Sequence, residues 1–192
     1  SFNPIGQAVI RLDRSELILD SKGTDAAGIG AVFASNVEVT GNAVIQSILN
    51  NGTLTLGAPN GFNTISIANG TTLVLDAIAG GLPVSNPGAT LNVSSQIVGG
   101  ASSTLTIRST LKNAGFTVTA AEADALGIAQ RIGNANVSRG IVALSGNNSG
   151  FTGTLNFEPG AGLRLEGVNS LNGRTFALNS ANNLFLLEDG DG

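Results

Sequence analysis

Short apolar runs recur at regular intervals between Val142 and Leu186, and these intervals decide the fold. The runs are Val142-Ala143-Leu144, Leu155-Asn156-Phe157, Leu163-Arg164-Leu165, Phe176-Ala177-Leu178 and Leu184-Phe185-Leu186. Long and short intervals alternate, so the pattern repeats from Val142 to Leu163 and again from Leu163 to Leu184. A fixed repeat of about twenty residues that carries two or three strands is typical of one coil of a parallel β-helix. Because one coil cannot bury its inward residues alone, coils stack into a continuous core.

Similar alternating runs precede this stretch, although their spacing is looser. They are Val37-Glu38-Val39, Thr53-Leu54-Thr55-Leu56, Ile65-Ser66-Ile67, Leu73-Val74-Leu75, Leu91-Asn92-Val93 and Leu105-Thr106-Ile107. The steps from Leu54 to Leu73 and from Leu73 to Leu91 are slightly shorter than the C-terminal repeat, and we interpret each as one coil. Asn and Gly tolerate the positive φ angles of tight corners, and they cluster between the runs, as at Asn69-Gly70.

The same Asn-Gly pairs allow a second all-β fold, an antiparallel β-sandwich built from hairpins. Hairpin strands lie two to five residues apart, whereas most gaps between these runs are five to ten residues. The gaps therefore favour the parallel β-helix (β-solenoid), with the β-sandwich as the alternative.

One stretch resembles a known family. Ser145-Gly146-Asn147-Asn148-Ser149-Gly150-Phe151-Thr152-Gly153-Thr154-Leu155, continued by Gly160-Ala161-Gly162-Leu163-Arg164-Leu165, is similar to the passenger-associated repeat of bacterial autotransporters. The resemblance covers about twenty residues (145–165), and Phe151 stands where that repeat commonly has Tyr. It implies a right-handed parallel β-helix that is exported to the bacterial surface. Within it, Asn147, Phe151, Gly153, Leu155, Leu163 and Leu165 are the structural repeat residues.

Two segments depart from the strand pattern. Thr119-Ala120-Ala121-Glu122 reads as a capping box before Ala-rich sequence, which predicts a short helical insertion over residues 119–133, with the helix near 119–132. Residues 1–40 predict two irregular strands that cap the solenoid, which itself covers residues 41–192. Alternatively, the first strands pair with a neighbouring subunit, and the candidate assembly residues are then Val9, Ile10, Leu12, Leu17, Ile18 and Leu19.

Composition excludes several classes of function. Charged residues make up 11% of the chain, against about 25% in an average soluble protein. The chain has no Cys and no His, which removes thiol chemistry, the Ser-His-Asp arrangement and the commonest metal ligand. Net charge is −4, and Arg11 and Arg14 are the nearest approach to a basic cluster, so we expect no nucleic-acid partner. No apolar run is long enough to insert into a membrane, and no cofactor motif occurs.

Carboxylates are the remaining chemical groups, and we interpret them as solvated turn residues. Asp76, Glu158 and Glu166 each follow a predicted strand, where a β-helix that cleaves polysaccharides would need clustered acids. Glu188, Asp189 and Asp191 resemble half of a calcium loop but lack the remaining ligands, so they are weak metal candidates. We therefore expect that the protein is not an enzyme.

Two functions remain. The first is a structural or adhesive module, at the bacterial cell surface or secreted, that presents loops from a stiff rod and contacts glycans, cells or other proteins. The second is a subunit that self-assembles into an extracellular filament or surface layer through its sheet edges or an exchanged N-terminal strand. A polysaccharide-processing enzyme is the least favoured alternative. Since the chain has no Met, we expect it to be a processed or excised piece of a longer product.

Overall fold

The structure, a computed structural model, describes residues 8–20, 31–49, 53–58, 62–79, 90–113, 116–119, 140–166 and 184–188. These residues form an all-β protein of sixteen strands. The strands are β1 (Val9–Leu12), β2 (Glu16–Asp20), β3 (Val32–Phe33), β4 (Asn36–Val39), β5 (Ala43–Leu49), β6 (Thr53–Leu56), β7 (Thr64–Ile67), β8 (Thr72–Ala79), β9 (Thr90–Val93), β10 (Gln96–Gly99), β11 (Thr104–Asn113), β12 (Phe116–Thr119), β13 (Ile141–Leu144), β14 (Thr154–Phe157), β15 (Gly162–Glu166) and β16 (Leu184–Glu188).

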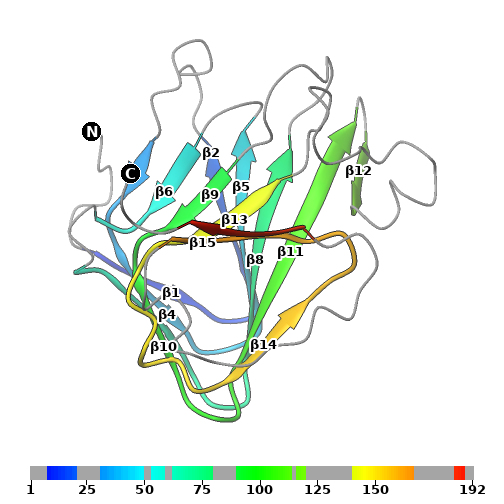
Figure 1. Ribbon diagram of the computed structural model, residues 1–192. Helices are drawn as coiled ribbons and strands as arrows, with labels where there is room; N and C mark the ends of the chain where they lie inside the picture. The colour runs from blue at the N-terminus through cyan, green and yellow to red at the C-terminus, as the bar shows by residue number, and fades with distance from the viewer. Residues whose placement is uncertain are drawn as a thin grey trace.

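The strands form three sheets that surround one core (Figure 1). Sheet A has the order β1-β4-β7-β10, sheet B the order β12-β11-β8-β5-β2 with β14 also paired to β11, and sheet C the order β16-β15-β13-β9-β6-β3. From β1 to β11 the chain visits A, B and C in turn, so three strands make one coil. Each pairing between successive coils is parallel, and this architecture is a right-handed parallel β-helix.

Parallel pairing excludes the antiparallel β-sandwich. The described strands contain one antiparallel pair, β11 with β12, in which Asn113 is opposite Phe116. This hairpin extends one strand of sheet B and does not form a second sheet. Thr119 ends β12, and the rest of the predicted helix, residues 120–133, lies outside the described residues.

Inward side chains stack in register from coil to coil. In sheet B, one inward row is Leu17, Ile45, Leu75, Ile107 and Phe157. The middle three have no exposed surface. Burial of fully enclosed aliphatic side chains contributes about 1.5–3 kcal/mol each, and this is the main stabilisation available to a chain with so few charges.

The predicted coil length is wrong for the first half of the chain. Leu54 pairs with Leu91 within sheet C, while Leu73 belongs to sheet B and pairs with Leu105. The steps from Leu54 to Leu73 and from Leu73 to Leu91 therefore join different sheets, and each covers only part of a coil. The coil is longer than the predicted repeat of about twenty residues, since Leu54 and its partner Leu91 are one coil apart. The predicted step from Val142 to Leu163 is confirmed, since these two residues are register partners. The next step is displaced by one residue, because Leu163 pairs with Phe185 and not with Leu184.

Asparagine side chains connect successive coils at the corners. The Oδ1 atom of Asn36 accepts the backbone N–H of Thr64 at 2.9 Å, and that of Asn42 accepts the N–H of Thr72 at 2.9 Å. Turns also need glycine: Gly57 has a φ of 113°, and a Cβ there would lie 2.5 Å from the backbone N of Ser95. The Asn- and Gly-rich corners predicted from sequence thus act partly as bridges between coils.

The described strands within residues 1–40 belong to the β-helix itself. β1 pairs with β4, β2 with β5 and β3 with β6, so they form the first coil of all three sheets. The predicted boundary between residues 40 and 41 falls between β4 and β5 of the second coil.

Candidate functional site

A polar cluster lies on the outer face of sheet B. It contains Gln46 of β5, Asp76 of β8, Arg108 and Thr110 of β11, and Glu158, which follows β14. Gln46, Asp76 and Arg108 occupy the same register position in successive coils. Their strand neighbours point inward, so these side chains point outward.

Asp76 organises this cluster through a single oxygen. Its Oδ2 atom accepts hydrogen bonds from Arg108 Nε (2.9 Å), Thr110 Oγ1 (2.8 Å) and Gln46 Nε2 (3.1 Å). Its Oδ1 atom is buried without a hydrogen-bond partner. Asp76 is completely buried, although it stands on the outer face of the sheet. A buried carboxylate needs such paired donors, because an unpaired buried charge is very costly.

Arg108 lies between two carboxylates. Its Nη1 atom is 4.0 Å from Oε1 of Glu158, and its side chain is 25% exposed. Partial burial raises the pKa of Glu158 above its usual value of 4.5, and Asp76 adds to this effect, while Arg108 opposes it. Because β5, β8, β11 and β14 belong to successive coils, the cluster spans four coils, from Gln46 to Glu158.

The prediction that Asp76 is a solvated turn residue is wrong. Asp76 lies inside β8, which continues to Ala79, and none of it is exposed. Sequence could not show this, because its three donors come from other coils, 30 to 34 residues away. Glu158 does follow a strand, as predicted, with 34% of its side chain exposed. Glu166 ends β15 and forms an ion pair with Arg164 of the same strand.

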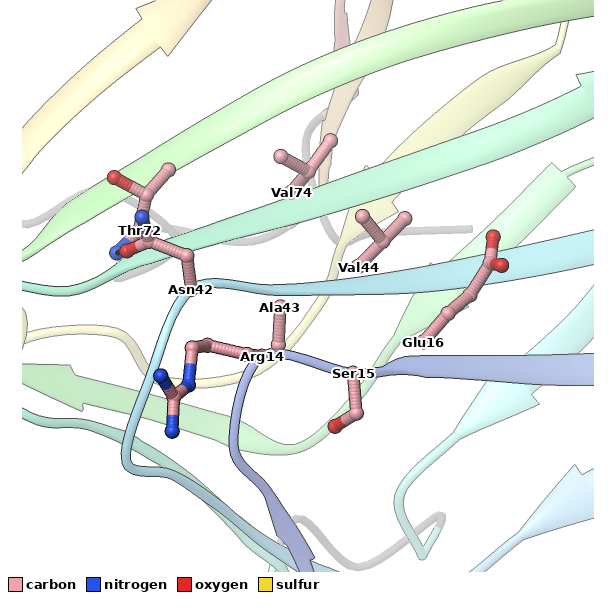
Figure 2. Close-up of a pocket in the computed structure, with 8 residues that line it drawn as sticks. All are labelled: Arg14, Ser15, Glu16, Asn42, Ala43, Val44, Thr72 and Val74. Atoms are coloured by element: carbon pink, nitrogen blue, oxygen red, sulfur yellow. Dashed lines mark hydrogen bonds between the residues drawn. The ribbon is translucent and has the colours of Figure 1, made fainter.

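A shallow open groove of about 690 Å³ lies beside this cluster on the same face (Figure 2). Its sides include Val44 and Val74, which are register partners on β5 and β8, and Glu16 of β2, which pairs with Val44. Figure 2 shows Arg14, Asn42 and Thr72 at the end of the groove where the three strands begin. Arg14 adopts a φ of 48°, and its side chain is 84% exposed. Val44 and Val74 offer an apolar surface without an aromatic ring on which a sugar could stack.

The repeat residues are placed mainly for packing. Phe151 is 2% exposed, belongs to the core and forms a parallel bridge to Gly99. A Cβ on Gly153 would clash with the backbone O of Ser103, so only glycine fits. Leu163 and Leu165 are buried in β15, while Leu155 is partly buried.

Asn147 and its neighbour Asn148 differ in role. Asn147 is exposed, and its Oδ1 accepts the backbone N–H of Ser149 at 3.1 Å. Asn148 is 3% exposed, and its Oδ1 accepts the N–H of Ile97 in the preceding coil at 2.7 Å. The sequence places both residues at a predicted corner, but the resemblance singles out Asn147 as the repeat residue, whereas the bridge to the neighbouring coil is made by Asn148.

The candidate assembly residues alternate between the core and the outer face of the first coil. Leu12 and Leu19 are buried, and Ile10 and Leu17 are partly buried against the core. Val9 and Ile18 are outward and are 52% and 50% exposed. These six residues therefore lie together at one end of the stack.

The described residues contain no group of three or more His, Cys, Asp or Glu side chains that could hold a metal ion. Glu188 is the last residue of β16, whereas Asp189 and Asp191 lie outside the described residues. Within the described part of the chain, no helix is long and apolar enough to cross a membrane.

Comparison with known proteins adds no relative to these observations. No family model matches the chain, and neither a curated protein nor a solved structure matches it.

Proposed function

We propose that this chain is a structural module of an exported bacterial protein, and that it presents its loops and outer faces for adhesion from a stiff β-helical rod. The observation that carries the proposal is the set of unbroken inward rows, such as Leu17, Ile45, Leu75, Ile107 and Phe157. Rows of this kind make stability additive along the stack, because each coil packs mainly on its neighbours. The similarity of residues 145–165 to the passenger-associated repeat supports an exported, surface-exposed setting.

The polar cluster supports a structural role better than a catalytic one. A polysaccharide-cleaving site needs two carboxyl groups that reach the same glycosidic bond. Asp76 is completely buried and already accepts three hydrogen bonds, so a bulky glycan has no access to it. The cluster instead connects the coils on their outer face, where Arg108 bridges Asp76 and Glu158.

The test combines a binding screen with an assay for hydrolysis. The folded chain is immobilised and screened against glycan arrays and whole cells, with heat-unfolded chain as the control. In parallel, a panel of polysaccharides is assayed for new reducing ends with the natural chain and with Glu158→Gln. We expect binding that requires the folded rod, and no hydrolysis. Hydrolysis that Glu158→Gln abolishes would overturn the proposal in favour of an enzyme.

A further inference from the structure

The groove on the outer face of sheet B places an apolar strip beside two opposite charges. Val44 and Val74 are register partners, and their partly exposed side chains form this valine strip. Arg14 and Glu16 line the same groove and are both exposed. Glu16 pairs with Val44, and Figure 2 shows the side chains of Arg14 and Glu16 extending in opposite directions. The groove therefore offers a cation, an apolar surface and an anion to a ligand.

Arg14 holds an unusual backbone conformation. Its φ of 48° lies in the left-handed region, which residues other than glycine rarely adopt. The corners that join sheets A and B in the next two coils contain Gly41 and Gly70. Gly70 has a φ of 75°, which glycine adopts without strain. An arginine in the first corner costs stability, and backbone strain of this kind is concentrated at functional sites such as ligand clamps. The strain at this corner thus points to a use for the Arg14 side chain.

Neighbouring groups orient Arg14 and complete a cluster of hydrogen-bond donors. Its Nε atom lies 3.4 Å from Oδ1 of Asp13, so Nη1 and Nη2 are the atoms that can meet a ligand. Gly41 supports this corner from the next coil, because a Cβ there would clash with Asp13 and lie 3.3 Å from Cγ of Arg14. At the same end of the groove, Oδ1 of Asn42 accepts the N–H of Thr72 at 2.9 Å, which fixes the Asn42 amide and leaves its Nδ2 to donate. This end of the groove therefore suits a carboxylate.

We propose that the groove binds an extended peptide segment of a partner protein, with an acidic side chain at Arg14, an aliphatic one on the valine strip and a basic one at Glu16. Such binding rests on the proposed adhesive role, for which it supplies the chemistry of the partner. The charges favour a peptide over an acidic glycan. Asp13 and Glu16 flank Arg14 along the chain, so a uniformly anionic polymer at Arg14 meets two carboxylates of like charge. A peptide can carry opposite charges at different positions and match both ends of the groove.

The spacing of the peptide side chains follows from strand geometry. In an extended chain, alternate side chains face the same way and are about 6.6 Å apart. Arg14 and Glu16 are also two residues apart, but their side chains extend in opposite directions, so their charged ends are separated by more than one such step. Two steps, with an aliphatic residue between the charges, fit this arrangement. The matching peptide is Asp-x-Leu-x-Lys, in which the three named side chains face the groove.

The experiment reverses the charge preference of the groove. The isotope-labelled chain is titrated at low ionic strength, where surface charges are least screened, while NMR follows the backbone amides of Val44 and Val74. The two probes are Asp-Gly-Leu-Gly-Lys and Asp-Gly-Leu-Gly-Asp, each with both chain ends capped. Glu16→Lys replaces the anion of the groove by a cation. Asp20→Lys is the matched control, because Asp20 is exposed on the same strand and the same face but does not line the groove.

We expect the natural chain and Asp20→Lys to bind the probe with Lys more tightly, and Glu16→Lys to prefer the probe with two Asp residues. Each preference should be about fivefold, which is the upper value for one exposed ion pair. Arg14→Gly removes the cation and relieves the positive φ, so it should weaken the binding of both probes without lowering the midpoint of thermal unfolding.

Three results would each overturn the peptide groove: no amide shifts in the natural chain, an unchanged preference in Glu16→Lys, or full binding by Arg14→Gly. Equal shifts of the same amides by an oligogalacturonate would overturn it too, and would assign the groove to an acidic glycan. The binding screen tests adhesion separately. Adhesion in that screen without peptide shifts would remove the groove and leave the adhesive role, whereas peptide binding without adhesion would support the groove and remove the adhesive role.

Discussion

Removal of the Asp76 carboxylate is expected to loosen the contacts among three successive coils, which carry β5, β8 and β11. In Asp76→Ala, the guanidinium of Arg108, the hydroxyl of Thr110 and the amide of Gln46 all lose their common acceptor. Breaking a buried ion pair by deleting one partner costs about 3–5 kcal/mol. Arg108 is 25% exposed and regains some hydration, so we expect the lower end, about 3 kcal/mol. For a chain of this size, that lowers the midpoint of thermal unfolding by roughly 6–12 °C.

Two controls separate the ion pair from general damage to the strand. Thr110→Val removes one hydrogen bond that a neutral hydroxyl donates to the same charged oxygen, and it should cost about 1.5 kcal/mol, the lower end for hydrogen bonds to charged groups. Asp76→Leu combined with Arg108→Met replaces the pair by apolar groups and should be more stable than Asp76→Ala, because no buried charge is left unpaired. Urea titration followed by circular dichroism gives the free energies of unfolding. A loss below about 1 kcal/mol in Asp76→Ala would refute the role of this cluster in holding the coils together.

Two further predictions concern single side chains. Because the pKa of Glu158 is raised, the folded state binds a proton at this carboxyl more readily than the unfolded state does. Its contribution to the free energy of unfolding is therefore greatest below pH 4.5. That contribution is lost as the pH rises through the folded pKa. Glu158→Gln should therefore unfold with a free energy at least as large as that of the natural chain at pH 7, and this difference should disappear near pH 4. Urea titration measures both values, and marked destabilisation at pH 7 would contradict the prediction. Asn148→Ala leaves the buried N–H of Ile97 without its acceptor and should cost about 1–3 kcal/mol. Asn147→Ala, at an exposed position, is its control, and equal losses in the two variants would contradict the assignment.

Strands with clear alternation could be predicted from sequence, because the inward residue of each repeats at every second position. Leu73-Val74-Leu75 and Leu163-Arg164-Leu165 both lie in strands as expected. Strand β10 was missed, since Gln96-Ile97-Val98-Gly99 shows a single inward aliphatic residue. The sequence alone also left open whether a coil has two or three strands. The strands of sheets B and C carry the same apolar pattern, and only their pairing shows to which sheet each belongs.

The candidate site depends on contacts that no local pattern encodes. Asp76, Arg108 and Glu158 lie far apart along the chain, and they meet because the intervals between them correspond to successive coils. The interval from Arg108 to Glu158 is much longer than that from Asp76 to Arg108, so a search for a fixed period cannot align them. The repeat residues Phe151 and Gly153 were named from the family resemblance, and in the structure they too act between coils: Phe151 forms a bridge to Gly99, and Gly153 allows a close approach to Ser103.

Disulfide formation between introduced cysteines tests the parallel stack most directly, since the chain has no Cys of its own. Thr104 and Thr154 are register partners on β11 and β14, so Thr104→Cys with Thr154→Cys places two Cα atoms about 4.8 Å apart, within the range of a disulfide. Asn156 is two positions further along β14, and Thr104→Cys with Asn156→Cys is too widely separated to close. We predict rapid oxidation of the first pair and not of the second, measured by mass spectrometry of the monomer. Equal oxidation of both pairs, or of neither, would contradict the stacked β-helix and its register.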